Sequence, residues 1–405
     1  MSMRYSRVMV ISLITHANLM FALILILLFI RSSSNSRCLK AEQPVGMFVF
    51  GDSYFDPGNN NYINTSTLDQ ANFPPYGLSF LPFPTGRFSD GRLVSDFIGE
   101  YAKLPLLPPF LQPGINRQRD FYTYNYGMNF ASAGAGCLLE TFQGYVIGLD
   151  KQLEYYKKAE SGMIKNLGYV EAKKRSTRAV YLFSIGTNDY TSLFLTNSIL
   201  FTSTSHSKYV ASVIGNLTTV ITEIYKRGGR KFGFLNLGPL GCYPGLRILK
   251  PEPANGSRQS SCLDEEVSLL AKLHNKQLSK SLSSMRKLFP DFKYTLFDFH
   301  TFLQARIMDP VRYGFKEGKA ACCGSGWLNG RFSCGGKRGE EEYEVCNHPH
   351  DHVFWDSYHF TQSLYQQMAS HMWTSASYTN HFGGGQNHTS KLITSYNLKT
   401  LFHCL

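Results

Sequence analysis

The chain repeats one pattern, a short apolar run that ends in a glycine-rich or polar turn. Four such runs occur, at residues 47–50 (MFVF), 179–185 (AVYLFSI), 231–237 (KFGFLNL) and 294–299 (YTLFDF). Apolar runs of this length, closed by turn residues, are typical of strands that are buried on both faces. Residues 207–229 and 261–289 lie between runs and carry apolar residues at helical spacing. This alternation predicts a parallel sheet with helices on both faces.

Two polar residues come directly after predicted strands. Ser53 ends the stretch 51–53 (GDS) after the first run, and Asn188 lies in 186–189 (GTND) after the second run. Ligands bind beyond the carboxyl ends of the strands in such sheets, so Ser53 and Asn188 are expected to converge at one edge. This position favours a functional role for Ser53 over that of an ordinary turn serine.

A serine hydroxyl becomes an effective nucleophile when a neighbouring base takes its proton. The base is usually a histidine that a carboxylate holds in the right tautomer. The stretch 353–361 (VFWDSYHFT) contains Asp356 and His359, and a spacing of three can place both side chains on one side of a turn. Acyl transfer also needs donors for an oxyanion. The candidates are the Ser53 N–H, a backbone N–H in 129–136 (NFASAGAG), and the amide of Asn188.

Four blocks in this order resemble the diagnostic blocks of the SGNH hydrolases: FGDSYFDPGNN (50–60), NFASAGAG (129–136), GTND (186–189) and DSYH (356–359). The plant-type secreted members of the GDSL esterase/lipase branch are the most similar, and the resemblance runs from about residue 44 to residue 375. Shorter motifs such as FPPYG, PTGRFSDGR, PLGCYP and ACCGSG also resemble that subfamily. The resemblance implies a flavodoxin-like three-layer α/β/α sandwich with a parallel central sheet. It also implies ester hydrolysis through an acyl-enzyme, with no metal and no organic cofactor.

The resemblance assigns roles to five residues: Ser53 as nucleophile, His359 as general base, Asp356 as third member of the triad, and Gly134 and Asn188 as oxyanion donors beside the Ser53 N–H. Gly136, two residues further on, is the alternative to Gly134. Asp52 and Asp56 are as well suited to organising the turn as to touching substrate, because aspartate side chains bond nearby backbone amides.

The expected function is that of a secreted serine esterase or lipase that hydrolyses carboxylic esters. The loop at residues 72–92 is rich in Phe and Pro, which suggests an apolar acyl pocket and fatty acyl substrates. The alternatives are a cell-wall O-acetyl esterase, an acyltransferase that passes the acyl group to an alcohol, and a non-catalytic secreted defence or binding protein on the same scaffold. The expected partner is an ester substrate.

The N-terminal region has the features of a secretory signal peptide. Arg4 and Arg7 precede an apolar stretch at residues 8–30, and a polar, small-residue segment follows. Residues 1–40 are therefore expected to direct export to the cell wall or apoplast, with an uncleaved anchor as the alternative. The hydrolase domain is expected at 44–375. The polar, glycine-rich stretch 376–405 is predicted to be a tail that lies on the surface or is mobile.

The charge excludes nucleic-acid binding as a leading function. The whole chain carries a formal net charge of +12. Cleavage near Ala41 would remove five basic residues and no acidic one, which leaves a mildly basic +7 with dispersed charges. Nucleic-acid-binding domains instead cluster their basic residues.

The cysteines agree with export. Six of the nine lie in Gly- and Pro-rich segments and allow fifteen disulfide pairings, among which the sequence does not choose: Cys242, Cys262, Cys322, Cys323, Cys334 and Cys346. Cys38, Cys137 and Cys404 are left over. A zinc site is the competing interpretation of the Cys group, and the alternating histidines in HPHDH (348–352) invite a metal interpretation too, but neither has ligand spacing typical of a metal site. Four N-x-S/T sequences are candidate glycan acceptors: Asn64, Asn216, Asn255 and Asn387.

Overall fold

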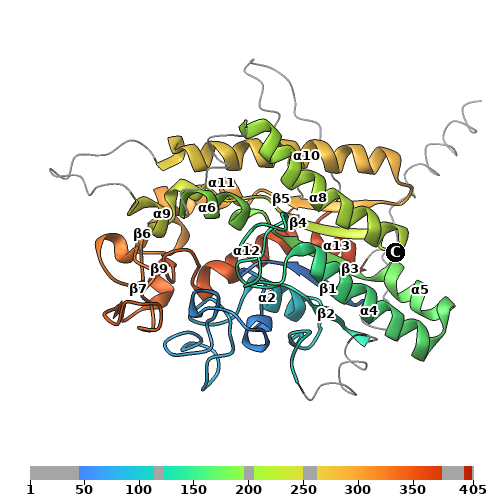
Figure 1. The fold of residues 1–405 in the computed structure, drawn as a ribbon, viewed down its shortest axis with the longest axis horizontal. Helices are drawn as coiled ribbons and strands as arrows, with labels where there is room; N and C mark the ends of the chain where they lie inside the picture. The colour runs from blue at the N-terminus through green and yellow to red at the C-terminus, as the bar shows by residue number, and fades with distance from the viewer. Residues whose placement is uncertain are drawn as a thin grey trace, which may run out of the picture. The chain divides into compact units, whose positions relative to one another are not determined.

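Five strands form one parallel sheet in the order β2–β1–β3–β4–β5 (Figure 1). The computed structural model describes residues 45–113, 123, 125–195, 205–249, 262–375 and 396–403, all of which except His403 belong to one unit, Ala41–Phe402. The strands are β1 (Met47–Gly51), β2 (Gly127–Asn129), β3 (Val180–Ser184), β4 (Lys231–Leu235) and β5 (Lys293–Phe297). This strand order is that of flavodoxin-like doubly wound sheets. The predicted three-layer α/β/α fold with a parallel central sheet is therefore confirmed.

The four apolar runs correspond to β1, β3, β4 and β5, and β2 is the strand that the pattern does not predict. It has only three residues, which pair with Met47, Phe48 and Val49 of β1. A three-residue strand is too short to show either a buried run or an alternation. Its position matters because the second sequence block, 129–136, follows it at the carboxyl edge of the sheet.

One face of the sheet carries aromatic rings from neighbouring strands. Phe48, Tyr181 and Phe232 stack across β1, β3 and β4, with 5.4 Å between the centroids of each neighbouring pair. A second row, Phe50, Phe183 and Phe234, stacks in the same way. Aromatic cross-strand pairs of this kind fix the register of the strands. Tyr156 of α4 (Leu149–Leu167) packs edge-on against the first row. The helix α4 covers this face of the sheet together with α8 (His206–Lys226) and α10 (Glu266–Leu288).

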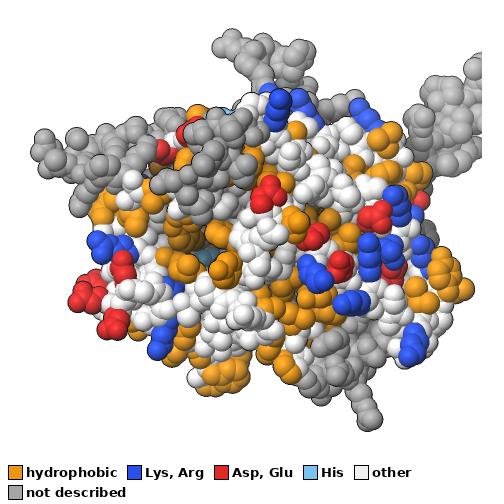
Figure 2. All heavy atoms as spheres, viewed as in Figure 1, with side chains coloured by type: hydrophobic (Ala, Val, Ile, Leu, Met, Phe, Trp, Pro, Cys, Tyr) orange, Lys and Arg blue, Asp and Glu red, His pale blue; other side chains and the backbone are white. Residues whose placement is uncertain are grey.

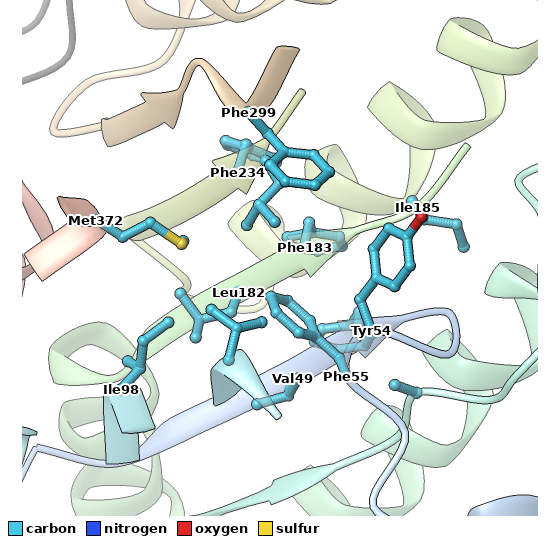
Figure 3. Packing of buried hydrophobic residues seen from close by; sticks show 14 of the residues in the cluster. Val49, Tyr54, Phe55, Ile98, Leu182, Phe183, Ile185, Phe234, Phe299 and Met372 are labelled. Carbon is cyan, nitrogen blue, oxygen red and sulfur yellow. The ribbon is translucent and has the colours of Figure 1, made fainter. Parts of the chain in front are cut away.

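The other face of the sheet is aliphatic. Val49 and Leu182 point towards Ile98 of α2 (Val94–Tyr101) and Met372 of α12 (Gln362–Thr374) (Figure 3). Gly233 leaves room here for a residue from near the end of the chain. A Cβ at this position would lie 2.9 Å from Cδ2 of Leu398 in α13 (Leu398–His403).

The predicted helices at 207–229 and 261–289 correspond to α8 and α10. The former ends at Lys226, just before the glycine pair, and the latter begins at Glu266. The remaining described elements are α5 (Tyr169–Arg178), α6 (Thr187–Leu195), α9 (Pro244–Arg247), α11 (Phe299–Met308), β6 (Glu317–Ala321) paired with β9 (His352–Phe354), β7 (Cys323–Gly324) paired with β8 (Glu344–Val345), and the short 3-10 helices η1 (Asn59–Tyr62), η2 (Thr67–Asp69), η3 (Leu240–Cys242), η4 (Cys262–Asp264), η5 (Val311–Tyr313), η6 (Trp327–Asn329) and η7 (Pro349–Asp351). Among the helices that the structure describes, none has the length and apolar character needed to span a bilayer.

Three disulfides select one solution from the fifteen possible pairings: Cys242–Cys262, Cys322–Cys346 and Cys323–Cys334. Cys322 and Cys346 lie close to His352, so three ligand-type atoms do come together. The two sulfurs are bonded to each other, however, and cannot act as the thiolate ligands that zinc requires. Cys137 is a free, buried thiol. Cys38 and Cys404 lie outside the described residues.

The end of the chain differs in part from the predicted surface tail. Residues 376–395 lie outside the described part, but α13 packs into the core. Leu398, Leu401 and Phe402 are buried, and the ring of Phe402 lies 5.4 Å from that of Trp373 in α12. The three residues have helical spacing and form one apolar stripe. Such a stripe is hard to distinguish from a surface segment when it is only six residues long.

We predict that Leu398→Ala destabilises the fold because it opens a cavity against Gly233 on the aliphatic face of the sheet. The unfolding free energy should fall by about 2–4 kcal/mol, as is usual for a buried leucine. Thermal or urea unfolding measures the change. Leu288→Ala is the matched control, since Leu288 is 73% exposed and should change stability by less than about 0.5 kcal/mol. Equal stabilities for the two variants would contradict the packing of α13.

Candidate active site

The turn after β1 presents Ser53 at the carboxyl edge of the sheet. Gly51 has a φ of 151°, and a Cβ there would lie 2.2 Å from the carbonyl oxygen of Ser184 in β3. Only glycine fits this approach between the two strands. Gln152 of α4 closes the turn from below: its Oε1 accepts from the N–H of Gly51 at 2.9 Å, and its Nε2 donates to the Gly51 carbonyl at 2.9 Å.

The structure brings Ser53, His359 and Asp356 together, although Ser53 and His359 are 306 residues apart in sequence. Ser53 Oγ lies 2.8 Å from His359 Nε2. His359 Nδ1 lies 2.7 Å from Asp356 Oδ1 and 2.9 Å from Oδ2. All three side chains are buried, with exposed fractions of 7% for Ser53, 6% for His359 and 0% for Asp356. This is the hydrogen-bond order of a serine nucleophile, a base and an orienting carboxylate.

Asp356 fixes the tautomer of His359. Burial tends to raise the pKa of the Asp356 carboxyl, but the nearby His359, its hydrogen bond, the charge of Arg338 and a hydrogen bond from Tyr76 lower that pKa to about 2. An ionised carboxylate can only accept hydrogen bonds, so Nδ1 of His359 carries the proton. Nε2 is then left as the acceptor for the Ser53 hydroxyl.

Two residues that the sequence analysis missed complete the surroundings of Asp356. The Tyr76 hydroxyl donates to Asp356 Oδ2 at 2.6 Å, and Arg338 Nη1 donates to the Tyr76 hydroxyl at 2.9 Å. Tyr76 belongs to the FPPYG motif, and Arg338 to the loop that follows Cys334. The FPPYG motif was the only sequence signal for Tyr76, and no pattern in the sequence pointed to Arg338.

Aromatic side chains shield the His359 ring. Phe88 packs against it at 4.4 Å between centroids, while Phe332 and Tyr54 lie at 6.1 and 6.2 Å. These rings come from three separate segments of the chain. They exclude water from the hydrogen bond between His359 and Asp356, which strengthens its electrostatic component.

The polar stretch after Ser53 fastens the second sequence block as well as its own turn. Asp56 accepts from the N–H groups of Gly58 and Asn59, and also from the N–H of Ala133 at 2.9 Å. Asn59 Nδ2 donates to the carbonyls of Asn129 and Ala131, and Asn60 Nδ2 donates to that of Ala133. Beyond the end of β2, these buried side chains add to the backbone hydrogen bonds that Phe130 and Ser132 still donate to Val49 and Gly51. Asp56 organises structure here, one of the two roles the sequence left open for it.

Two backbone N–H groups are free near the Ser53 hydroxyl. Among the hydrogen bonds of the described residues, none uses the N–H of Ser53 or of Gly134. Gly134 lines the same cavity as Ser53 and His359. It has a φ of 78°, and a Cβ there would lie 2.6 Å from Asp69 Oδ1. Gly136 instead packs under Asp189, where a Cβ would lie 2.5 Å from its carboxylate. The geometry favours Gly134 over Gly136 as a donor to a bound oxygen.

Asn188 is the second residue of α6 (Thr187–Leu195) and lies close to Ser53, Gly134 and His359 in the lining of one cavity. One hydrogen of its Nδ2 is used by the carbonyl of Ala135 at 3.0 Å, which leaves the second hydrogen available. Asp189, beside it, accepts from the N–H groups of Cys137 and Leu138. The stretch 186–189 therefore supplies a candidate donor and anchors the loop that carries Gly134.

The candidate residues open onto a cavity of about 600 Å³. Ser53, Gly134, Asn188 and His359 share it with mainly apolar side chains: Leu68, Phe88, Phe142, Tyr145, Leu195, Tyr243, Phe332 and Tyr358. Figure 2 shows hydrophobic side chains gathered around a hollow on the visible face. A cavity of this size and lining is typical of sites for small apolar ligands.

Asp52, next to Ser53, is buried in a different environment from Asp356. Its Oδ1 accepts from the N–H of Tyr54 at 3.1 Å, whereas its Oδ2 has no hydrogen-bond partner. Burial, and to a smaller extent the neighbouring charge of Asp189, raises the pKa of Asp52 to about 8. Asp52 therefore organises the turn and is protonated near neutral pH.

The other candidate residues that the structure describes do not line this cavity. Asn64 and Asn216 are exposed, and Asn216 Nδ2 donates to the carbonyl of Cys137 at 3.0 Å. Asn255 and Asn387 lie outside the described residues, so all four glycan sites stay predictions. Within the described ranges, the histidines at 348–352 form no group of three or more ligand-type side chains, apart from His352 beside the oxidised Cys322 and Cys346.

Comparison with known proteins agrees with the geometry. The family model described as GDSL-like Lipase/Acylhydrolase matches residues 47–372. The chain is 55% identical to GDSL esterase/lipase 5 of Arabidopsis thaliana over 88% of its own length and 87% of that protein. It is 47% identical to GDSL esterase/lipase 1 of the same plant, over 88% and 89%, and 40% identical to a GDSL lipase of Tanacetum cinerariifolium, over 90% of each chain.

We predict that Asp52→Asn stabilises the protein at alkaline pH more than at acidic pH. A carboxyl whose pKa is raised on folding contributes stability that is complete below its ordinary pKa and is lost as the pH rises through the folded value, here about 8. Between pH 5 and pH 8, the unfolding free energy of the variant relative to wild type should rise by at least about 1 kcal/mol. Thermal unfolding across this range measures it. The exposed Asp309→Asn is the control, and parallel curves for all three proteins would refute the prediction.

Proposed function

This chain belongs to the GDSL-like lipase/acylhydrolase family of carboxylic ester hydrolases, and on that premise we propose that it is a secreted serine esterase that cleaves fatty acyl esters through an acyl-enzyme. The observation that carries the proposal is the chain of hydrogen bonds from Ser53 Oγ to His359 Nε2 and from His359 Nδ1 to Asp356. This chain provides a hydroxyl, a base to take its proton and a carboxylate to hold the base.

In the first half of the proposed reaction, Ser53 Oγ attacks the ester carbonyl carbon while its proton moves to His359 Nε2. The carbonyl π electrons become the lone pair of an oxyanion. Ser53, Gly134 and Asn188 all line the cavity, and we infer that the N–H groups of Ser53 and Gly134 and the second Nδ2 hydrogen of Asn188 donate to this oxygen. The ionised Asp356 stabilises the imidazolium that forms at this stage.

Collapse of the tetrahedral intermediate breaks the bond to the alcohol oxygen, which takes the proton from His359 Nε2 and leaves. The acyl group then remains on Ser53. In the second half, His359 takes a proton from a water molecule, whose oxygen attacks the acyl carbon. The second tetrahedral intermediate then collapses: the bond between the acyl carbon and Ser53 Oγ breaks, Oγ takes the proton back from His359, and a carboxylic acid is released. An alcohol in place of the water would give transesterification by the same steps.

The cavity supports a fatty acyl group as the substrate class. Its volume of about 600 Å³ greatly exceeds what an acetyl group occupies, and Leu68, Phe142, Tyr145 and Leu195 offer apolar surface to a longer chain. Burial of each methylene contributes about 0.8 kcal/mol. An acetyl ester would leave most of this surface unused, so the geometry favours fatty acyl esters over cell-wall O-acetyl groups.

Two features support export. Residues 1–40 have the charge and apolar pattern of a signal peptide. Three disulfides hold the described part of the chain, and disulfides form and persist in oxidising compartments. We therefore place the enzyme outside the cell, in the wall or apoplast.

Ser53→Ala should abolish hydrolysis, because it removes the attacking oxygen. We expect the wild type to cleave nitrophenyl octanoate with a higher kcat/KM than nitrophenyl acetate, and the variant to lose at least about a thousandfold in kcat on both. A fluorophosphonate probe followed by mass mapping should label Ser53 in the wild type and nothing in Ser53→Ala.

Different outcomes would point to the alternatives. A label on another serine, or equal rates in the two proteins, would overturn the site. Faster cleavage of acetylated wall polysaccharide than of any lipid ester would favour the O-acetyl esterase. New esters formed from added alcohols would indicate an acyltransferase. Biological activity that persists in Ser53→Ala would indicate a non-catalytic protein.

Asn188→Ala should lower kcat by about 10²–10³ and leave KM nearly unchanged, because the amide is proposed to bind the oxyanion rather than the ground-state ester. Steady-state kinetics on the octanoate ester measures both constants. Asn166→Ala serves as the control, since Asn166 is an exposed residue of α4. A rise in KM with an unchanged kcat would exclude Asn188 from the oxyanion hole.

A further inference from the structure

The hydroxyl of Tyr76 has its hydrogen-bond direction fixed by its two neighbours. It lies 2.6 Å from Asp356 Oδ2 and 2.9 Å from Arg338 Nη1. A guanidinium can only donate and an ionised carboxylate can only accept. Tyr76 must therefore accept from Arg338 and donate to Asp356. In such a chain each hydrogen bond polarises the next, so the positive charge of Arg338 is relayed to the carboxylate.

The guanidinium of Arg338 also ties three segments of the chain together. Its Nη1 donates to the carbonyl of Cys334 in its own loop. Its Nε donates to the carbonyl of Thr67 and its Nη2 to that of Gln70, at either end of η2. Lysine carries one compact ammonium and cannot reproduce this planar fork of donors.

Arg338 contacts two parts of the site, η2 and the phenylalanines that pack against His359. Ser66, Leu68 and Asp69, in and next to η2, line the cavity. The guanidinium lies 4.1 Å from the ring centroid of Phe332 and 5.8 Å from that of Phe88, the two phenylalanines that pack against His359. Arg338 therefore contacts both the η2 segment that lines the cavity and the aromatic rings that cover His359.

The loop that carries Arg338 is itself fastened to the Asp356 segment. Cys334 is bonded to Cys323, whose N–H donates to the carbonyl of Trp355 at 2.7 Å. Trp355 immediately precedes Asp356. A closed ring results, from Asp356 through Tyr76 and Arg338 to Cys334, across the disulfide to Cys323 and back. The ring keeps Arg338 at a fixed distance from the carboxylate.

We propose that Tyr76 and Arg338 are positioning residues for the reaction: Tyr76 holds the Asp356 carboxylate towards His359, and Arg338 adds a positive charge that favours the carboxylate while it holds η2 as a wall of the cavity. This inference rests on the proposed function of Ser53, His359 and Asp356. It assigns two separable effects to Arg338, one on the reactivity of the Asp356–His359 pair and one on substrate binding.

The test compares Tyr76→Phe, Arg338→Met, Arg338→Lys and the double variant Tyr76→Phe/Arg338→Met on the octanoate ester across pH. We expect Tyr76→Phe to lower kcat about tenfold with KM changed less than about twofold. Arg338→Met should lower kcat, raise KM, and move the acid limb of the kcat/KM profile to higher pH, because loss of the charge makes the Asp356–His359 pair easier to protonate. Arg338→Lys should restore the acid limb but not KM.

The double variant should have a kcat only slightly lower than that of Arg338→Met alone, because both changes break the same chain of hydrogen bonds.

Two control variants match these changes. Tyr156→Phe removes a buried hydroxyl that lies 3.0 Å from the Tyr181 hydroxyl, and Arg230→Met removes a guanidinium that lies over Tyr225 and donates to the backbone carbonyls of Tyr225 and Gly229. Both should keep the kcat, KM and acid limb of the wild type.

Active-site titration with the fluorophosphonate gives the folded, reactive fraction of each variant, so kcat can be expressed per competent site. Wild-type kcat and acid limb in both Tyr76→Phe and Arg338→Met would overturn the inference. So would losses that disappear once rates are divided by the titrated fraction, since these would show a purely structural role. If Ser53→Ala stays active, the proposed function fails first; if Ser53→Ala is inactive while these variants behave as wild type, only the present inference fails.

Discussion

The ionised carboxylate of Asp356 is the group around which the rest of the site is built. It is fully buried, and burial alone would favour its protonated form. The N–H groups of Tyr358 and His359, the ring of His359 and the hydroxyl of Tyr76 all donate to it. An unpaired buried charge is strongly destabilising, so the segments that carry these donors must be in place for the fold to tolerate it. Orientation of the His359 ring and stability of the surrounding loops are thus two results of one interaction.

Other buried carboxylates in the site are in the opposite condition. Burial raises the pKa of Asp52 to about 8 and those of Asp56 and Asp189 to about 6, even though backbone N–H groups donate to each of them. These three hold the turn of Ser53 and the loop of Gly134, whereas Asp356 faces the histidine. Neighbouring carboxyl groups with pKa values pushed apart are characteristic of sites in which each has a different task. Residue type alone does not distinguish these four aspartates. The groups around each carboxyl decide whether its pKa is raised or lowered.

Much of this arrangement could be predicted from sequence because it depends on local patterns. Buried runs closed by glycine gave four strands of the sheet, and the rule that sites lie at carboxyl ends placed Ser53 and Asn188 at one edge. β2 was not predicted, because a strand of three residues is too short to show a periodic pattern. Tyr76 and Arg338 escaped because their roles come from contacts made across 280 and 262 residues of chain, which no local pattern encodes. The core position of Leu398 was missed for a related reason: the gap that receives it is made by Gly233, far away in the sequence.

The parallel sheet carries Ser53 and leads into Asn188, but it does not carry His359. The histidine follows β9, which pairs with β6 outside the main sheet and lies beside two disulfides formed by the adjacent residues Cys322 and Cys323. The Ser53 hydroxyl and the His359 ring thus belong to separate supports: the main sheet holds the first, and a two-strand pair beside two disulfides holds the second. A change in length or sequence within the cross-linked loop can shift His359 relative to the Ser53 hydroxyl while leaving the sheet intact. Reactivity in such a chain can therefore change through the cross-linked loop, while the five-strand sheet that defines the fold stays the same.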